Sequence, residues 1–247
     1  MSENSKKRAL VTGSSRGIGR AIAISLAKDG YEVLVHCAGN RDKAKETAEI
    51  IAQNGGRAIV LKADLCSTEE TKALAAQMGD IDVLVLNASL QIRNSWSRIS
   101  VEECYEQLNC NLVSSLMLIQ AAVPHMKRQK WGRIVTIGSV QEKKPHPDML
   151  IYSASKAAQT NMMQSMSLQL AAEGITVNNV APGVIYTDRN REVLSDADYA
   201  RKVTDSIPAG FYGEPGDCAG IVSLLCSEKG RYITGQSIYV DGGKSVQ

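Results

Sequence analysis

The sequence predicts a doubly wound α/β fold, in which a parallel sheet of seven strands is covered by helices on both faces. Two observations lead to this fold class. Short apolar runs alternate along the chain with stretches in which apolar residues recur at helical spacing, and apolar strands separated by helices are typical of a buried parallel sheet. No linker rich in Pro, Gly or Ser and no internal repeat breaks the alternation, so we expect a single domain over residues 1–247.

The first half of the chain is expected to supply four strands and three helices. Each expected strand is a short run dominated by Val, Leu, Ile and Ala. The strands are expected at 8–12, 32–37, 57–63 and 82–88, and the helices at 19–29, 41–54 and 68–78. Each strand is thus followed by a helix, which is the usual connection between parallel strands.

The second half continues the alternation with longer helices. They are expected at about 101–127 and 152–173, and the strands at 133–139, 175–182 and 235–240. The segment 187–215 breaks the pattern, because it is polar and lies between a strand end and a helix that begins with Pro215. Ligands bind outside the carboxyl ends of the strands in such sheets, so we expect this segment to be a flexible lid.

The composition argues against several classes of partner. A net charge of +2 on 247 residues gives no indication of a nucleic acid or an anionic membrane surface. The first residues lack the apolar core of a secretory signal, and no apolar run has the length of a bilayer span. Six Cys without a Cys-x-x-Cys pair and three widely separated His indicate reduced thiols and no metal site. We therefore expect a cytoplasmic protein that acts on a small molecule.

The first strand leads directly into a glycine-rich turn, TGSSRGIG at 12–19. Glycines at these positions let the backbone turn tightly and approach a pyrophosphate, and the helix that follows points its N–H groups at the phosphates. The position between a strand and a helix is the context that this motif requires. It predicts a Rossmann-type dinucleotide site, with cofactor residues Gly13, Ser15, Arg16, Gly17, Ile18 and Gly19.

The end of the second strand indicates which dinucleotide is bound. An NAD site uses a carboxylate there to hold the ribose 2′-hydroxyl, but this chain has Cys37, and Asp42 comes only inside the next helix. Arg16 and Arg41 flank the position, and guanidinium groups bind a 2′-phosphate through charge-assisted hydrogen bonds. We expect NADP to be preferred over NAD. The alternative for Arg41 is a solvated residue in the first turn of its helix.

Further polar motifs follow in a fixed order. They are Asp64 and Leu65, Asn87-Ala88, Asn111, Ser139, Tyr152-x-x-x-Lys156, PGVIYT at 182–187 and VDGG at 240–243. Ser139 stands thirteen residues before Tyr152. Together with the glycine turn, this set resembles the classical short-chain dehydrogenase/reductase family over nearly the whole chain. Within the family it resembles 3-oxoacyl-carrier-protein reductases and sugar dehydrogenases such as glucose 1-dehydrogenases. The resemblance implies interconversion of a carbonyl and a secondary alcohol by hydride transfer.

The residues agree with that chemistry. Tyr152 and Lys156 lie four residues apart and so on one face of a helix. A nearby ammonium favours the phenolate form, which suits Tyr152 to general acid/base catalysis. Ser139 would hydrogen-bond the reacting oxygen, and the resemblance implies that Lys156 also holds the nicotinamide ribose. It further implies that Asn111 orders a water in a proton relay to the lysine. The alternatives are a merely polar helix residue, or Asn109 in that role.

The resemblance also assigns cofactor contacts. It places Asp64 against the adenine, whereas the residue pattern alone allows Asp64 to be a helix N-cap. It places Asn87 and Ala88 beside the cofactor. The segment expected to meet the nicotinamide carboxamide and the phosphates contains Pro182, Gly183, Ile185 and Thr187. Ser89 departs from the family pattern, because a glycine is usual there, and its effect on the pocket is left open.

The expected substrate pocket is polar. Ser139, Gln141 and Tyr152 are the candidate substrate residues, and further polar side chains could reach inward: Gln91, Arg93, His146, Asp148 and Arg189. A steroid or a long acyl chain calls for an apolar lining, so a sugar or an oxo-acid is favoured. The alternative is that most of these side chains face water.

Two other functions stay open. A 3-oxoacyl-carrier-protein reductase would present cations to its acidic partner, and Lys127, Arg128, Lys130 and Arg133 could serve, but Glu173 is acidic where many such reductases are basic, so an acyl carrier protein is not favoured. A non-catalytic NADP-binding regulatory protein on the same fold would be expected to lose Ser139, Tyr152 or Lys156. The family commonly forms tetramers through its long central helices and a C-terminal segment, which residues 232–243 resemble, so a homotetramer is expected.

Overall fold

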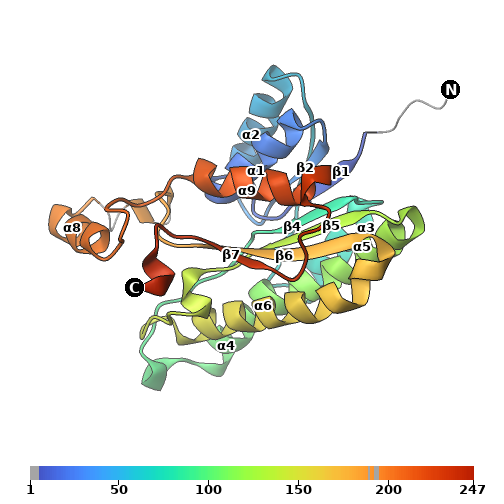
Figure 1. Cartoon of the computed structure of the whole chain (residues 1–247). Coiled ribbons are helices and arrows are strands. Elements are labelled where there is room, and N and C mark those ends of the chain that lie inside the picture. The colour runs from blue at the N-terminus through green and yellow to red at the C-terminus, as the bar shows by residue number, and fades with distance from the viewer. Residues whose placement is uncertain (1–5, 189, 192–194) are drawn as a thin grey trace.

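Seven parallel strands form one sheet in the order β3-β2-β1-β4-β5-β6-β7 in the computed structural model, which describes residues 6–188, 190–191 and 195–247 (Figure 1). The strands are β1 (Arg8–Val11), β2 (Glu32–Cys37), β3 (Arg57–Lys62), β4 (Val83–Leu86), β5 (Gly132–Ile137), β6 (Ile175–Pro182) and β7 (Ser237–Val240). β1 pairs with β2 on one side and with β4 on the other. The strand order therefore reverses at β1, and ligands bind outside such a switch point.

Helices cover both faces of the sheet (Figure 1). One face carries α1 (Gly17–Lys28), α2 (Arg41–Gln53) and α9 (Pro215–Cys226), and the other carries α3 (Thr68–Met78), α4 (Val101–Leu108), α5 (Ser114–Gln129) and α6 (Leu150–Leu170). Successive strand residues point to opposite faces. In β1, Val11 packs against the first set of helices and Leu10 against the second. The doubly wound fold class predicted from the sequence is confirmed.

Two predicted elements differ in detail. The edge strand β3 is half exposed along its length, because an edge strand lacks the neighbour that covers a central one. The segment predicted as one long helix from about 101 to 127 contains a π-helical turn, Asn109–Val113, between α4 and α5. Such turns are frequent at functional sites, and this one contains Asn111.

The predicted lid segment includes a short helix, α8 (Ala197–Asp205), which lies beyond the carboxyl ends of the strands (Figure 1). The next helix, α9, begins with Pro215 as predicted, a position where the missing N–H of proline costs no hydrogen bond. Among the helices in the described ranges, none has the length and apolar character needed to cross a membrane.

Candidate active site

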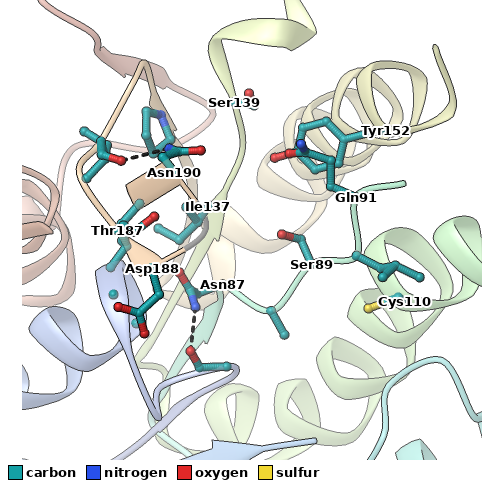
Figure 2. A pocket seen from close by; sticks show the side chains of 18 of the residues that line it. Asn87, Ser89, Gln91, Cys110, Ile137, Ser139, Tyr152, Thr187, Asp188 and Asn190 are labelled. Atoms are coloured by element: carbon teal, nitrogen blue, oxygen red, sulfur yellow. Dashed lines mark hydrogen bonds between the residues drawn. The ribbon is translucent and has the colours of Figure 1, made fainter. Parts of the chain in front are cut away.

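A cavity of about 1150 Å³ opens at the carboxyl ends of the strands (Figure 2). The loops after β1, β2, β3, β4, β5 and β6 all contribute to its lining, and α8 adds Tyr199 and Val203. Almost all of the predicted cofactor residues lie along this one cavity. Those that line it are Gly13, Ser15, Arg16, Gly17, Ile18, Gly19, Asp64, Leu65, Asn87, Ala88, Tyr152, Pro182, Gly183, Ile185 and Thr187.

The glycine turn has the geometry of a phosphate-binding loop. Gly13 and Gly17 adopt positive φ angles of 64° and 56°, which favour glycine. A Cβ on Gly19 would stand 2.4 Å from the carbonyl oxygen of Gly13, so a larger residue does not fit there. α1 begins at Gly17, and Gly17, Ile18 and Gly19 of its first turn line the cavity. These features fit a dinucleotide pyrophosphate.

The turn is tied to the loop after β4. The Thr12 hydroxyl oxygen accepts hydrogen bonds from the N–H groups of Asn87 at 2.9 Å and Ala88 at 3.0 Å. The Asn87 amide nitrogen donates to the carbonyl oxygens of Thr12 at 2.9 Å and Gly13 at 3.1 Å. Asn87 therefore ties the loop after β4 to the glycine turn, and Figure 2 shows its amide nitrogen in a hydrogen bond.

His36 braces the turn from the side of β2, a role that the sequence did not reveal. Its Nδ1 accepts the N–H of Gly13 at 3.0 Å, so its proton is on Nε2, which donates to the carbonyl oxygen of Ala63 at 2.9 Å. Burial lowers the pKa of His36 to about 4. The imidazole is therefore neutral near neutral pH and holds Gly13 through its unprotonated nitrogen.

Arg20 fixes the same turn from α1. Its Nε and Nη2 donate to the carbonyl oxygen of Ser15 at 3.0 and 2.7 Å. Nη2 also reaches the carbonyl oxygen of Lys43 at 3.2 Å. Arg20 thus connects the glycine turn to the first turn of α2, where the adenosine end of a dinucleotide would lie.

The cations at that end include Lys43, which the sequence did not single out. Arg16 and Lys43 line the cavity, whereas Arg41 is exposed and is not part of the lining. Asn40 caps α2 by accepting the N–H of Lys43 at 3.0 Å. Lys43 is thus a further candidate for the cation site, and Arg41 stays a prediction.

Asp188 is paired with these cations. Its carboxylate lies 3.3 Å from Lys43 Nζ, 3.9 Å from an Arg16 guanidinium nitrogen and 3.4 Å from one of Arg191. The hydrogen bond from Lys43 lowers the pKa of Asp188 below its ordinary value. The two cavity cations are thus already near an anionic group of the chain.

Asp64 is not a helix cap. Ser67 is the N-cap of α3, since its hydroxyl accepts the N–H of Glu70 at 3.2 Å. The Asp64 carboxylate accepts the N–H of Cys66 at 2.9 Å and lines the cavity beside Leu65.

The predicted catalytic residues meet at the opposite end of the cavity. Ser139 follows β5, and its hydroxyl oxygen accepts the N–H of Gln141 at 3.2 Å, so the hydroxyl proton can be donated to a substrate oxygen. Tyr152 lies in the first turn of α6 and faces the same space as Ser139 (Figure 2). Lys156 lies one turn further along α6, with Nζ 5.8 Å from the centre of the Tyr152 ring. It does not line the cavity and is 1% exposed.

Asn111 lies behind these residues and is fully buried. Its amide nitrogen donates to the carbonyl oxygen of Leu90 and to the Ser155 hydroxyl, both at 2.9 Å. Its amide oxygen accepts the N–H of Leu90 at 2.8 Å. The side chain therefore ties α6 to the loop after β4, and the main-chain carbonyl of Asn111 faces Gln159 of α6, whose amide nitrogen is 3.1 Å away.

The chain is similar in sequence to a known protein family and to proteins of known activity. The profile described as short chain dehydrogenase matches residues 7–198. The chain belongs to this family. A 3-oxoacyl-[acyl-carrier-protein] reductase FabG of Staphylococcus aureus strain Mu50 is 39% identical over 241 residues, which cover 96% of this chain and 97% of that protein. An L-rhamnose 1-dehydrogenase (NAD(P)(+)) of Azotobacter vinelandii strain DJ is 38% identical over 248 residues, 97% of either chain.

A solved structure supports the same assignment. The crystal structure of a 3-oxoacyl (acyl-carrier-protein) reductase from Agrobacterium tumefaciens C58 with NADP bound is similar with a TM-score of 0.92 and 35% identity, covering 96% of this chain and 93% of that one. This short-chain dehydrogenase is therefore an enzyme, an oxidoreductase of the same fold and family.

The end of the cavity beside Ser139 and Tyr152 is lined by polar side chains together with apolar ones such as Leu90, Val140 and Met149. Gln91, Arg93, Gln141 and His146 line the cavity, whereas Asp148 does not; Arg189 lies outside the described residues. An Arg93 guanidinium nitrogen is 3.5 Å from His146 Nε2. Ser89, which replaces the usual family glycine, directs its hydroxyl toward the cavity in Figure 2.

Proposed function

We propose that this enzyme interconverts a carbonyl and a secondary alcohol, with NADP(H) as cofactor, Tyr152 as general acid/base and a polar substrate of the sugar or oxo-acid type. The observation that carries the proposal is the placement of Tyr152 and Ser139 in the same cavity as the glycine turn. A dinucleotide that lies on the turn and extends through the cavity ends beside these two hydroxyls.

The residues present fit that cofactor. The glycine turn and the N-terminus of α1 would hold the pyrophosphate, and the loop after β6 would hold the nicotinamide end. This loop also reaches the turn, because a Cβ on Gly17 would lie 3.4 Å from the Thr187 methyl carbon. Bound NADPH supplies the hydride. The buried Lys156 donates to the carbonyl oxygen of Ile137 at 2.7 Å and does not line the cavity, so its contact with the nicotinamide ribose is proposed on the family resemblance alone.

The two hydroxyls handle the reacting oxygen. In the reductive direction Ser139 would donate a hydrogen bond to the carbonyl oxygen, and Tyr152 would donate its proton to the oxygen as negative charge develops there. In the oxidative direction Tyr152 would accept the proton of the alcohol. The positive charge of Lys156 next to the ring stabilises the phenolate that remains after proton donation.

The preference for NADP is supported by the charges at the adenosine end. Arg16 and Lys43 both line the cavity there, and the end of β2 supplies Cys37 in place of a carboxylate. The relative from A. tumefaciens was crystallised with NADP bound. Comparison of the dissociation constants of NADPH and NADH tests the preference, and tighter binding of NADH would contradict it.

The substrate is best found by a panel of sugars, oxo-acids and acyl thioesters followed by NADPH absorbance. The lining supports the first two classes, because Gln91, Arg93 and His146 offer hydrogen-bond donors. Turnover restricted to hydrophobic ketones would contradict the proposal. Unchanged turnover in Tyr152→Phe would contradict the catalytic role of Tyr152 and favour a regulatory, non-catalytic protein.

A 3-oxoacyl-carrier-protein reductase is the second candidate, since named relatives carry that activity. The proposed basic docking surface is weak, however. Arg133 is 2% exposed, Arg128 pairs with Asp80 at 3.3 Å, and Lys130 pairs with Glu173. These ion pairs leave little net positive charge for an acidic carrier protein. A higher kcat/KM for an acyl thioester than for every sugar and oxo-acid would reverse this order.

We also propose that copies of the chain associate into a tetramer. Large apolar side chains are exposed on α4, α6 and the segment before β7: Tyr105 is 64% exposed, Leu168 86% and Tyr232 98%. Sedimentation at micromolar concentration should give the mass of four chains, and Leu168→Glu should lower that mass. A monomer in the unmodified protein would contradict the proposal.

A further inference from the structure

A buried glutamine lies directly beneath the catalytic lysine. Gln159 follows Lys156 by three residues on α6 and is 0% exposed. Its amide oxygen accepts a hydrogen bond from Lys156 Nζ at 3.1 Å. Because residues three apart on a helix are neighbours, this contact follows from the helix itself and does not depend on a loop.

The other half of the amide is anchored to the π-helical turn and α5. Its nitrogen donates to the carbonyl oxygen of Asn111 at 3.1 Å and to the Ser115 hydroxyl oxygen at 3.0 Å. Ser115 in turn donates to the same carbonyl at 3.1 Å. An ammonium offers only donors and a carbonyl only acceptors, so the amide can satisfy both neighbours in one orientation alone.

This arrangement fixes the position of a costly charge. A buried ammonium must have hydrogen-bond acceptors, or its desolvation is unfavourable. Lys156 Nζ donates to the main-chain oxygen of Ile137 and to the side-chain oxygen of Gln159. The amide nitrogen of Gln159 makes two hydrogen bonds of its own. These bonds restrict the amide, and so they also restrict the oxygen that accepts from Lys156.

We propose that Gln159 is a positioning residue for catalysis, which holds the Lys156 ammonium at Tyr152 by tying it to the carbonyl of Asn111. The proposal rests on the proposed function of Tyr152 and Lys156. An amide donates on one side and accepts on the other, but it does not pass a proton between them. The Gln159 amide therefore serves to position Lys156.

Two substitutions separate polarity from size. Gln159→Met keeps about the same volume and removes both the acceptor and the donors. Gln159→Ala removes them too, but leaves a space bordered by Lys156 Nζ and the Asn111 carbonyl. A water fills a small space that offers such polar partners and can restore the link.

The test measures kcat per folded enzyme at saturating NADPH, together with the dissociation constant of NADPH and the unfolding temperature. Loss of a hydrogen bond to a charged group predicts that Gln159→Met lowers kcat about tenfold. Gln159→Ala should lose less, about threefold. Met163→Ala is the structural control, because Met163 lies on α6 in the apolar core. It should lower the unfolding temperature and keep kcat.

Each outcome bears on the proposal. If both Gln159 variants keep the kcat of the unmodified enzyme, as the Met163 control does, Gln159 only fills the core and the proposal is wrong. If Gln159→Met does not fold, Gln159→Leu takes its place, because leucine also fills the space without hydrogen-bonding, and an unchanged kcat in that variant overturns the proposal. The catalytic role of Tyr152 is tested separately. Retained turnover in Tyr152→Phe refutes that role, whatever the Gln159 variants show. A loss of turnover in Tyr152→Phe without a loss in Gln159→Met refutes only the role of Gln159.

Discussion

The two ends of the cavity are built in different ways. At the proposed catalytic end, Lys156 is 1% exposed and its neighbours Gln159 and Asn111 are 0% exposed. They are connected by hydrogen bonds at 3.1 Å, from Lys156 to the Gln159 amide oxygen and from the Gln159 amide nitrogen to the Asn111 carbonyl oxygen. At the adenosine end, the Arg16 side chain is 62% exposed and that of Lys43 39%, and both pair with Asp188 through ion pairs at the surface.

The difference between buried hydrogen bonds and exposed ion pairs suits the two ends to different tasks. Buried, satisfied hydrogen bonds hold one geometry, because leaving any member without a partner is costly. Exposed ion pairs contribute little and exchange partners easily, since water and salt screen them. The catalytic end is therefore suited to fixing a proton donor, and the adenosine end to exchanging an internal carboxylate for a phosphate.

The largest effect is expected at the catalytic end. Tyr152→Phe removes the proton donor and should lower kcat about a thousandfold, the typical contribution of a general acid. The change is measured as NADPH consumption with the best substrate of the panel. Tyr105→Phe, on the exposed face of α4, removes the same hydroxyl elsewhere and should keep kcat. A comparable loss in both variants would contradict the assignment.

The second effect is on stability and comes from His36, which is buried beside the glycine turn. Burial lowers the pKa of His36 from its ordinary 6.5 to about 4. Between these values the unfolded chain binds a proton that the folded chain does not, so stability falls as pH falls through this window. From about pH 7 to pH 5 this group should cost about 2 kcal/mol of the free energy of unfolding.

Urea denaturation at the two pH values measures this loss. In His36→Gln the group that titrates is absent, so the difference in unfolding free energy between the two pH values should shrink by that amount. An equal pH dependence in both proteins would show that His36 is not neutral in the folded state.

The third effect concerns the cations. Lys43→Met removes a donor to the 2′-phosphate and should raise the dissociation constant of NADPH about tenfold, with little change for NADH. Lys45→Met is the matched control, because Lys45 is on the same helix and pairs with Asp42 at 3.4 Å, away from the cavity. If Lys43→Met weakens both dinucleotides equally, Lys43 does not contact the phosphate.

The smallest effect has the opposite sign. Asp188→Asn removes the carboxylate that competes for Lys43 and Arg16, and should tighten NADPH about threefold, the magnitude of an exposed ion pair. Asp42→Asn removes a charge from the first turn of α2 without freeing either cation and serves as the control. A weaker or unchanged NADPH affinity in Asp188→Asn would mean that Asp188 does not compete.

The sequence predicted some residues at each end of the cavity and missed others. The strands were predictable because buried parallel strands are apolar along their length, and the glycine turn, Ser139, Tyr152 and Lys156 carry recognisable spacings. Gln159 was missed, since its partner Asn111 is 48 residues away in the chain and only the fold brings them together. Lys43 and Asp188 are 145 residues apart, and no local pattern joins them.

Arg41 stays a predicted cofactor residue, since it is exposed and follows the end of β2 without lining the cavity. The sequence assigns no functional role to His36. Its position one residue before the end of β2 was the available signal, because a side chain there can reach the neighbouring turn.

The separation of tasks is tested most directly by measuring kcat and the NADPH dissociation constant in Tyr152→Phe and Lys43→Met side by side. The account predicts that Tyr152→Phe loses kcat and keeps NADPH affinity, whereas Lys43→Met loses NADPH affinity and keeps kcat at saturating cofactor. Equal changes of both quantities in both variants would contradict it.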